Sequence, residues 1–550
     1  MKSVANYICK FQLHYWLLLI LLIVFTIIRL ASINIGFCTA WDEAYFLIKL
    51  KEAYEGSFIT GKSQWNLIAI HWFPYLDLTN PIHSRIAVYL CELFATIAAT
   101  FTCIRVYGKN RWLKYFTLSY LLFFQVSSSY AGSSLNYVQM QALLMCLALC
   151  SFHLYWNSES KYNFFWLVIT GISLGQSLFV ILPSGILLIV CFGLLLLLKK
   201  DGKSILCFGG GLLISLICIH VFVAPLSDIL EAMRFTATYF SQSGYRYSPK
   251  DFGAALGLLA RDVLLCLIIC SGIYYLTQRV LKYNKVIAMV LMGILTLFYY
   301  YYQKSPQTAV SIIIFCYLLI QIIDNHILSK KCFNKINKLY SLLLVAFPLL
   351  ASIGTNTYLG DRMICFALAW FLLYLDYHDY VKEENNIPVV ETATLLLLLT
   401  LIPRISGLLN KDAHSNFTRG NASFAKISLT TDQVDYFNKC LDVMEEYGYK
   451  PDSSVVFTSE YDYSTVFAID AKLSSNFYQK RNFLYFPKEE MLKPDFVFMC
   501  AWDKMEIGKA LNDMPWGWPQ EFDSVFVGSP EGKGLPWDTD RWLYCRKKEK

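Results

Sequence analysis

The sequence predicts a polytopic α-helical membrane protein that carries a small α/β domain outside the membrane at its C-terminal end. Of the 550 residues, 56% are hydrophobic and only 16% are charged. The apolar residues gather into long runs, and a helix of about 20 such residues can cross the hydrocarbon layer because it satisfies its own backbone hydrogen bonds. After residue 411 these runs stop and shorter patterned segments replace them.

About thirteen runs have the length and composition of membrane spans. We place them at 13–31, 84–104, 113–130, 134–156, 163–180, 183–198, 204–224, 256–278, 285–302, 306–327, 337–354, 361–379 and 392–409. The two runs that flank Pro183 are alternatively one kinked helix. The first run lacks a small-residue cleavage site, so we expect a retained span rather than a removable signal peptide.

Basic residues predict the orientation of the spans. Lys2 and Lys10 precede the first span, and further lysines and arginines fall in alternate loops, which the positive-inside rule places in the cytoplasm. The acidic loop 380–391 departs from this pattern. An odd number of spans puts the C-terminus outside. We therefore expect a multi-pass protein of a plasma membrane, the inner membrane of a bacterium, with a cytoplasmic N-terminus.

The chain divides into a transmembrane unit, 1–410, and a soluble unit, 411–550. Two loops of the first unit, 32–83 and 225–255, are expected outside. The second loop is rich in aromatic residues, which predicts an interfacial helix followed by a mobile Ser/Gly/Tyr segment.

The soluble unit begins with "TTDQVDYFNKCLDVMEEYG", which predicts a capped amphipathic helix that ends at Gly448. The strand-like runs that follow are "SVVFTSE", "NFLYFP", "DFVFMCA", "DSVFVG" and "RWLYCRK". Together they indicate a small α/β domain. Cys440, Cys500 and Cys545 lie in this unit, and their odd number leaves any disulfide pairing unassigned.

The first outer loop holds two adjacent carboxylates, Asp42 and Glu43, in the stretch "WDEAYFL". One interpretation is structural: Thr39 and Asp42 fit a capping box that opens a helix over about 40–55 along the membrane surface. The other is catalytic. Helical spacing places Asp42, Phe46 and Lys49 on one face, where a carboxylate can take a proton from an attacking hydroxyl while cations hold a departing phosphate. The two interpretations are compatible, since a capping acid has a fixed rotamer.

This arrangement resembles the GT-C glycosyltransferases. The branch with protein O-mannosyltransferases and the lipid A aminoarabinose transferase is most similar. Those enzymes have an Asp-Glu pair after the first span and a proline motif just before the second. Here the pair is Asp42-Glu43, and "LTNPIHSRIAVYL" supplies Pro81-Ile82. The arrangement covers the whole chain, whereas the residue-level match is confined to these two motifs.

The resemblance implies a membrane glycosyltransferase that moves a sugar from a polyprenyl-phosphate donor to an extracytoplasmic glycan, lipid or protein. Asp42 would be the general base, Glu43 its catalytic partner, and the reaction would invert the anomeric centre. The chain has no Walker or glycine-rich phosphate motif, which agrees with a lipid-linked donor. No cofactor is required. A divalent metal ion is an alternative, with His71, His83 and His414 as its candidate ligands, although dispersed surface histidines are the commoner explanation.

Two departures from the family pattern concern the phosphate. Tyr45 stands where the aminoarabinose transferase has an arginine, and Asn80 stands where it has a lysine. The candidate cations that remain for the donor phosphate are Lys49, His83, Arg85, Arg234, Arg246 and Arg362. Each is alternatively a cation that snorkels to the interface. The candidate loop and acceptor-pocket residues are Tyr45, Asn80, Pro81, His83, Tyr245, Tyr247 and Tyr358.

Two other functions compete with the transferase. One is a transporter or flippase of lipid-linked saccharide, and the other is a non-catalytic GT-C-like subunit. One observation argues against the transporter: each acid within the predicted spans can be interpreted as lying near a span end. These acids are Glu92, Asp262 and Asp324. The sugar and the acceptor are not specified by the sequence.

Overall fold

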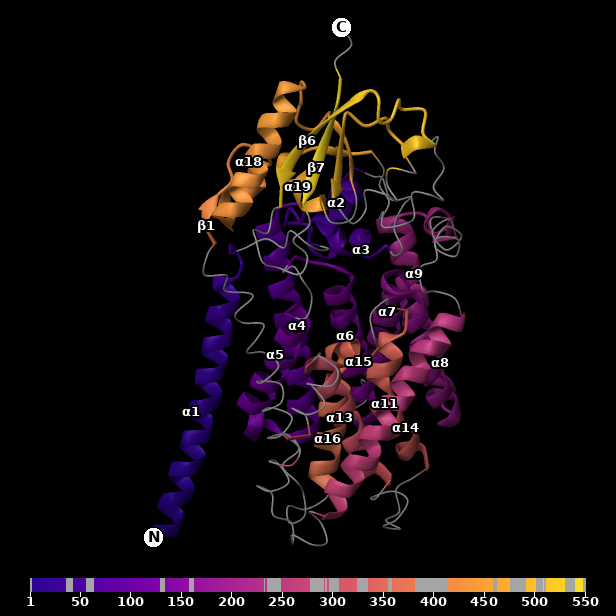
Figure 1. The fold of residues 1–550 in the computed structure, drawn as a ribbon. Coiled ribbons are helices and arrows are strands. Elements are labelled where there is room, and N and C mark those ends of the chain that lie inside the picture. The colour runs from indigo at the N-terminus through magenta and orange to yellow at the C-terminus, as the bar shows by residue number, and fades with distance from the viewer. Residues whose placement is uncertain are drawn as a thin grey trace.

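A helical bundle and a small mixed β-sheet make up the part of the chain that the structure describes (Figure 1). The computed structural model describes residues 2–35, 43–55, 64–128, 134–157, 163–231, 233–234, 249–276, 291, 294–295, 306–323, 335–354, 359–380, 413–458, 462–474, 491–500, 508, 511–529 and 540–547. The sheet lies at one end of the bundle, and the N-terminus lies at the other.

The helices that precede the C-terminal part are the following. They are α1 (Lys2–Ala31), α2 (Glu43–Tyr54), α3 (Trp65–Trp72), α4 (Pro81–Tyr107), α5 (Trp112–Ser128), α6 (Tyr137–Asn157), α7 (Asn163–Val180), α8 (Leu182–Leu198), α9 (Gly202–Cys218), α11 (Pro249–Tyr275), α13 (Pro306–Ile322), α14 (Lys335–Ser352), α15 (Leu359–Met363) and α16 (Leu368–Tyr380). Three shorter helical elements join them: the 3₁₀ helices η1 (Lys109–Arg111) and η5 (Ile364–Phe366) and the π-helix η2 (Ile219–Val223).

Five helical segments among the described residues are long and apolar enough to cross a membrane. They are Pro81–Tyr107, Tyr137–Asn157, Asn163–Val180, Gly202–Val223 and Leu256–Tyr275. Shorter apolar helices include Leu18–Ala31 and Leu182–Leu198. These segments support a membrane protein. The count of about thirteen spans stays a prediction, and the run at 392–409 lies outside the described residues.

Two predicted segments take a definite form in the structure. α7 ends at Val180 and α8 begins at Leu182, so the segment forms two helices with a break at Ile181 rather than one kinked helix. Pro183 lies in the first turn of α8, where its missing N–H removes no helical hydrogen bond. In the loop 225–255, residues 226–231 are helical, and α11 already begins at Pro249. The Ser/Gly/Tyr segment between them is outside the described residues.

α7 and α9 cross at glycines. A Cβ on Gly171 would lie 2.3 Å from the carbonyl oxygen of Phe208, and one on Gly211 would lie 2.2 Å from that of Val168. Both distances are far below van der Waals contact. The backbones therefore approach as closely as they do because these positions have no side chain, as in other small-residue crossings of membrane helices.

We expect Gly211→Ala to lower the free energy of unfolding by about 1–3 kcal/mol, because the added methyl group forces α7 and α9 apart. Gly210→Ala is the matched control, since a Cβ there has nothing within 4 Å. The thermal unfolding midpoint of each purified variant measures the effect. Equal midpoints for the two variants would contradict the close approach.

A buried ion pair joins α1 to α4. Arg29 Nη2 lies 3.2 Å from Glu92 Oε1, and the two side chains are 1% and 3% exposed. Nearby, Phe25 of α1 packs with Tyr120 and Phe124 of α5. Glu92 lies inside α4 and is buried, so the interpretation of this acid as one near a span end was wrong. Such a pair costs desolvation and is better understood as fixing which helices meet than as a source of stability.

The C-terminal part forms two sheets. β1 (Ala413–Asn416) and β2 (Ser428–Thr430) pair antiparallel. The larger sheet has the order β4-β3-β5-β7-β6, in which β3 is parallel to β4 and β5, and β7 is antiparallel to β5 and β6. Its strands are β3 (Val455–Thr458), β4 (Lys472–Leu473), β5 (Phe496–Cys500), β6 (Phe522–Gly528) and β7 (Arg541–Arg546). The remaining elements are η6 (Ala422–Lys426), α18 (Thr431–Glu446) and α19 (Tyr463–Ile469).

The capped helix predicted for this part is confirmed as α18. Thr430 Oγ1 accepts from the backbone N–H of Gln433, and Gln433 Oε1 accepts from that of Thr430, which completes a capping box. Past the end of the helix, Gly448 has a φ of +86°, which suits glycine. Four of the predicted strand runs form β3, β5, β6 and β7. The run "NFLYFP" lies outside the described residues.

α2 lies between the bundle and the C-terminal sheet domain (Figure 1). Phe46, Leu50 and Ala53 belong to the core of the bundle. Ala44 and Leu47, on another face of the helix, belong to the core of the C-terminal domain. Apolar residues on two faces therefore bury this helix in protein, and its placement along the membrane surface stays a prediction.

Candidate functional site

The site is built on the start of α4. Asn80 is the N-cap residue, and its Oδ1 accepts from the backbone N–H of Ile82 at 2.9 Å. Pro81 takes the first helical position, where proline is favoured because its φ suits the helix. The motif "TNPI" is thus a helix start, and it fixes where the following residues point. Asn80 and Pro81 remain predictions as acceptor-pocket residues.

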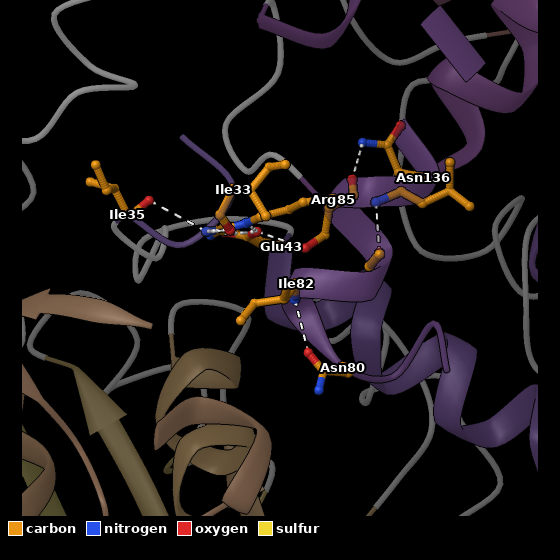
Figure 2. Close-up of polar contacts among 10 residues, drawn as sticks. Ile33, Ile35, Glu43, Asn80, Ile82, Arg85 and Asn136 are labelled. Atoms are coloured by element: carbon orange, nitrogen blue, oxygen red, sulfur yellow. Dashed lines mark hydrogen bonds and ion pairs between the residues drawn. The ribbon is translucent and has the colours of Figure 1, made fainter. Parts of the chain in front are cut away.

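Arg85, one turn further along α4, forms a buried ion pair with Glu43 at the first position of α2. Its Nε and Nη2 donate to Glu43 Oε1 at 3.1 and 3.0 Å, and both side chains are 1% exposed. Ser134 Oγ donates to the same carboxylate oxygen at 2.7 Å. Figure 2 shows Glu43 and Arg85 pointing toward each other. Glu43 is therefore held by charge-assisted hydrogen bonds rather than facing open solvent.

Arg85 also contacts the chain that leads into the acid pair. Its Nη1 donates to the carbonyl oxygens of Ile33 and Ile35 at 2.9 and 3.4 Å (Figure 2). On the other side of this stretch, the backbone N–H of Ser428 donates to the carbonyl oxygen of Asn34 at 2.8 Å. The end of α1, the start of α4 and strand β2 thus meet at one place.

The face of α2 that the sequence assigns to the site is aromatic and cationic. Phe46 packs edge-on against Trp65 of α3 and Tyr137 of α6, with ring centroids 5.8 and 5.9 Å apart. Lys49 is 4% exposed, and its Nζ lies 5.7 Å from the centroid of the Tyr45 ring. Asp42, the predicted base, is outside the described residues. It immediately precedes Glu43 in the chain.

Arg362 is distant in the sequence from Phe46 and Tyr137, but it contacts the same aromatic cluster. It lies on α15, is 2% exposed, and donates from Nη2 to the hydroxyl oxygen of Tyr137 at 2.8 Å. Its guanidinium carbon lies 5.4 Å from the centroid of the same ring. Tyr137 therefore links Arg362 to Phe46. The snorkelling alternative does not fit Lys49, Arg85 or Arg362, since all three are buried inside the protein.

The opposite side of α2 contacts the C-terminal domain. The ring of Tyr45 lies 5.6 Å from that of Tyr463 on α19, measured between centroids. At the end of the helix, Lys51 Nζ lies 3.0 Å from Asp452 Oδ1 and 3.6 Å from Asp470 Oδ1. Tyr45 thus contacts the C-terminal part of the chain as well as Lys49.

The other candidate residues are not drawn together. Arg234 is exposed near the end of the short helix after η2, and His83 is half-buried on α4. His71 is exposed on α3, with Nδ1 2.7 Å from the carbonyl oxygen of Leu67, and His414 is exposed on β1. In the described part of the chain, no three His, Cys, Asp or Glu residues gather as a metal site. The candidates Tyr245, Arg246, Tyr247 and Tyr358 lie outside it.

Ser134 and the backbone of Ile33 and Ile35 are parts of the site that sequence reasoning missed. Ser134 is 91 positions from Glu43, and Arg85 is 42 positions from it. No local pattern signals such pairs. A polar residue just before a span, such as Ser134 before α6, does not by itself indicate which residue it contacts.

Comparison with known proteins gives likeness in structure only. No family model and no curated protein matches this chain. Among solved structures, the Archaeoglobus fulgidus oligosaccharyltransferase AglB, in complex with an inhibitory peptide and a dolichol-phosphate, covers 96% of this chain and 75% of its own, at 12% identity and a TM-score of 0.41. ArnT from Cupriavidus metallidurans, bound to undecaprenyl phosphate, covers 96% and 98% at 10% identity and a TM-score of 0.40. Both are GT-C superfamily glycosyltransferases.

Proposed function

We propose that this chain is a membrane glycosyltransferase that moves a sugar from a polyprenyl-phosphate donor to an acceptor on the outer side of the membrane. One observation carries the proposal: the residue next to Asp42 is anchored in a buried charge pair where the bundle meets the C-terminal domain. A site at such a junction is reachable by a lipid-linked donor from the bundle side and by a polar acceptor from the domain side.

In the proposed reaction an acceptor hydroxyl attacks the anomeric carbon, and its proton passes to Asp42. The new glycosidic C–O bond forms as the bond from the anomeric carbon to the phosphate oxygen breaks. The electron pair leaves with polyprenyl phosphate, and the anomeric centre inverts. Asp42 is the catalytic base, and Glu43 supports it from its pair with Arg85. We expect no nucleotide and no metal ion to be needed.

The leaving phosphate gains negative charge, so cations beside it lower the barrier. Lys49 and Arg362 are the best placed candidates of the predicted set, because both are buried around the aromatic cluster of Phe46 and Tyr137. Arg234 and Arg246 stay candidates from the sequence alone. We propose that the C-terminal domain, which contacts α2 through Tyr463, presents the acceptor.

The proposal includes the topology expected from the sequence, with the N-terminus in the cytoplasm and the C-terminal domain outside a bacterial inner membrane. The purified protein in sealed vesicles, supplied with a radiolabelled polyprenyl-phosphate sugar and an envelope extract as acceptor, tests the function. We expect label to move into the acceptor fraction. No labelled acceptor, together with full recovery of the donor, would contradict it.

A transporter of lipid-linked saccharide is the second candidate, because Arg29 and Glu92 form a buried ion pair inside α1 and α4. Charged residues within membrane helices often mark transport pathways. The same vesicles separate the two functions. A transporter carries intact labelled donor across the bilayer and forms no new glycoside.

A further inference from the structure

We propose that Arg85 is a positioning residue for the transfer, not a ligand of the donor phosphate. Its one guanidinium holds Ile33 and Ile35 together with Glu43, the neighbour of the proposed base in the chain. This inference rests on the proposed function for the role of Asp42. The contacts that carry it do not depend on that role.

The geometry divides the guanidinium between two flanks of the chain. Nη1 donates to the carbonyl oxygens of Ile33 and Ile35, on the first flank. Nε and Nη2 donate to Glu43, on the second. A planar fork with fixed N–H directions can serve both partners at once, which a lysine ammonium at the end of a flexible chain does less well. The residue therefore acts as a non-covalent cross-link between the backbone of Ile33 and Ile35 and the side chain of Glu43.

Other residues also hold the two parts of the chain that Arg85 contacts. Ser134 donates to the same Glu43 oxygen, and the first flank is tied to strand β2 through Asn34 and Ser428. Glu43, the next residue after Asp42 in the chain, is thus held by three buried hydrogen bonds. A catalytic group must be held within about 0.5 Å of its working position, and buried anchors of this kind provide that restraint.

The same contacts argue against phosphate binding by Arg85. Its side chain is 1% exposed, and Glu43 is equally buried. To bind a phosphate, Arg85 would have to give up its contacts with Glu43, a carboxylate that is itself buried. Breaking a buried pair is strongly unfavourable. Loss of a phosphate ligand, the role predicted for Arg85 from the sequence, raises the KM for the donor. Loss of a positioning residue instead lowers kcat.

The test compares Arg85→Lys and Arg85→Met with Arg105→Lys in the vesicle assay. Arg105 is exposed near the other end of the same helix, so its variant controls for loss of an arginine from α4. A misplaced catalytic group costs about 100-fold in rate. We expect kcat to fall by about that factor in both Arg85 variants, while the KM for the donor changes less than about twofold. Unchanged kcat with a raised donor KM would overturn the proposal in favour of phosphate binding.

Hydrogen–deuterium exchange supplies a readout that does not need activity. In Arg85→Met, amides of both flanks, 30–35 and 43–50, should exchange faster than in the wild type, while those of 137–157 should not change. Unchanged exchange at either flank would overturn the cross-link. Inactive wild-type protein would instead defeat the proposed function, whatever the exchange result. Arg85→Lys keeps the charge, so it gives a folded variant to measure if Arg85→Met fails to fold.

Discussion

Asp42→Asn is expected to abolish sugar transfer while leaving the protein folded. The amide has nearly the shape of the carboxylate but cannot accept the proton of the attacking hydroxyl. Loss of a general base typically lowers the rate by about 10²- to 10⁴-fold. The initial rate of label transfer, measured at saturating donor, checks this result, and elution as a monodisperse species checks the fold.

Glu43→Gln is the informative companion to that variant. It also removes one carboxylate, but it leaves Arg85 buried against a neutral amide. We therefore expect it to lower both the activity and the thermal unfolding midpoint, whereas Asp42→Asn lowers activity alone. Near-normal transfer by Asp42→Asn would remove the role assigned to this residue.

Leu47→Ala and Leu50→Ala should each destabilise the protein by about 2–5 kcal/mol, but in different places. Both leucines are 0% exposed on α2. Leu47 packs in the core of the C-terminal domain, and Leu50 packs in the core of the bundle. Each truncation leaves a cavity in its own core. If the domain is built around α2, the two variants will loosen different parts of the molecule.

Native cysteines report where each variant opens. Cys440 is a thiol in the same core cluster as Leu47, and burial raises its pKa, so it reacts with an alkylating agent only when the domain opens. Cys91 lies in the bundle core with Leu50. In Leu47→Ala, the temperature at which Cys440 reacts should fall more than the temperature at which Cys91 reacts. In Leu50→Ala, the larger fall should be at Cys91. Equal shifts of both thiols in both variants would show a single core instead of two.

The sequence predicts best what local rules determine. The capping box of Thr430 and Gln433 and the glycine at position 448 place α18 to within a residue or two, because cap chemistry acts over one turn. Four strand runs and the apolar helices follow from periodicity in the same way. The start of α4 at "NP" is likewise encoded in two adjacent residues.

The site is less predictable because its contacts are not local. An acid pair before a helix reads as a cap, and nothing near Glu43 in the sequence reveals that Arg85 and Ser134 close around it. The same limit applies to α2. Nothing in its own sequence shows that the C-terminal part of the chain covers one of its faces with Tyr463 and its neighbours.

Whether this chain itself transfers a sugar is tested most directly by counting both products in one reaction. Purified wild-type protein receives a doubly labelled polyprenyl-phosphate sugar and the envelope extract, beside Asp42→Asn. We predict equal amounts of glycosylated acceptor and released polyprenyl phosphate from the wild type, and neither from the variant. Intact donor after prolonged incubation with the wild type, or equal product from both proteins, would contradict the proposed function and the role of Asp42 respectively.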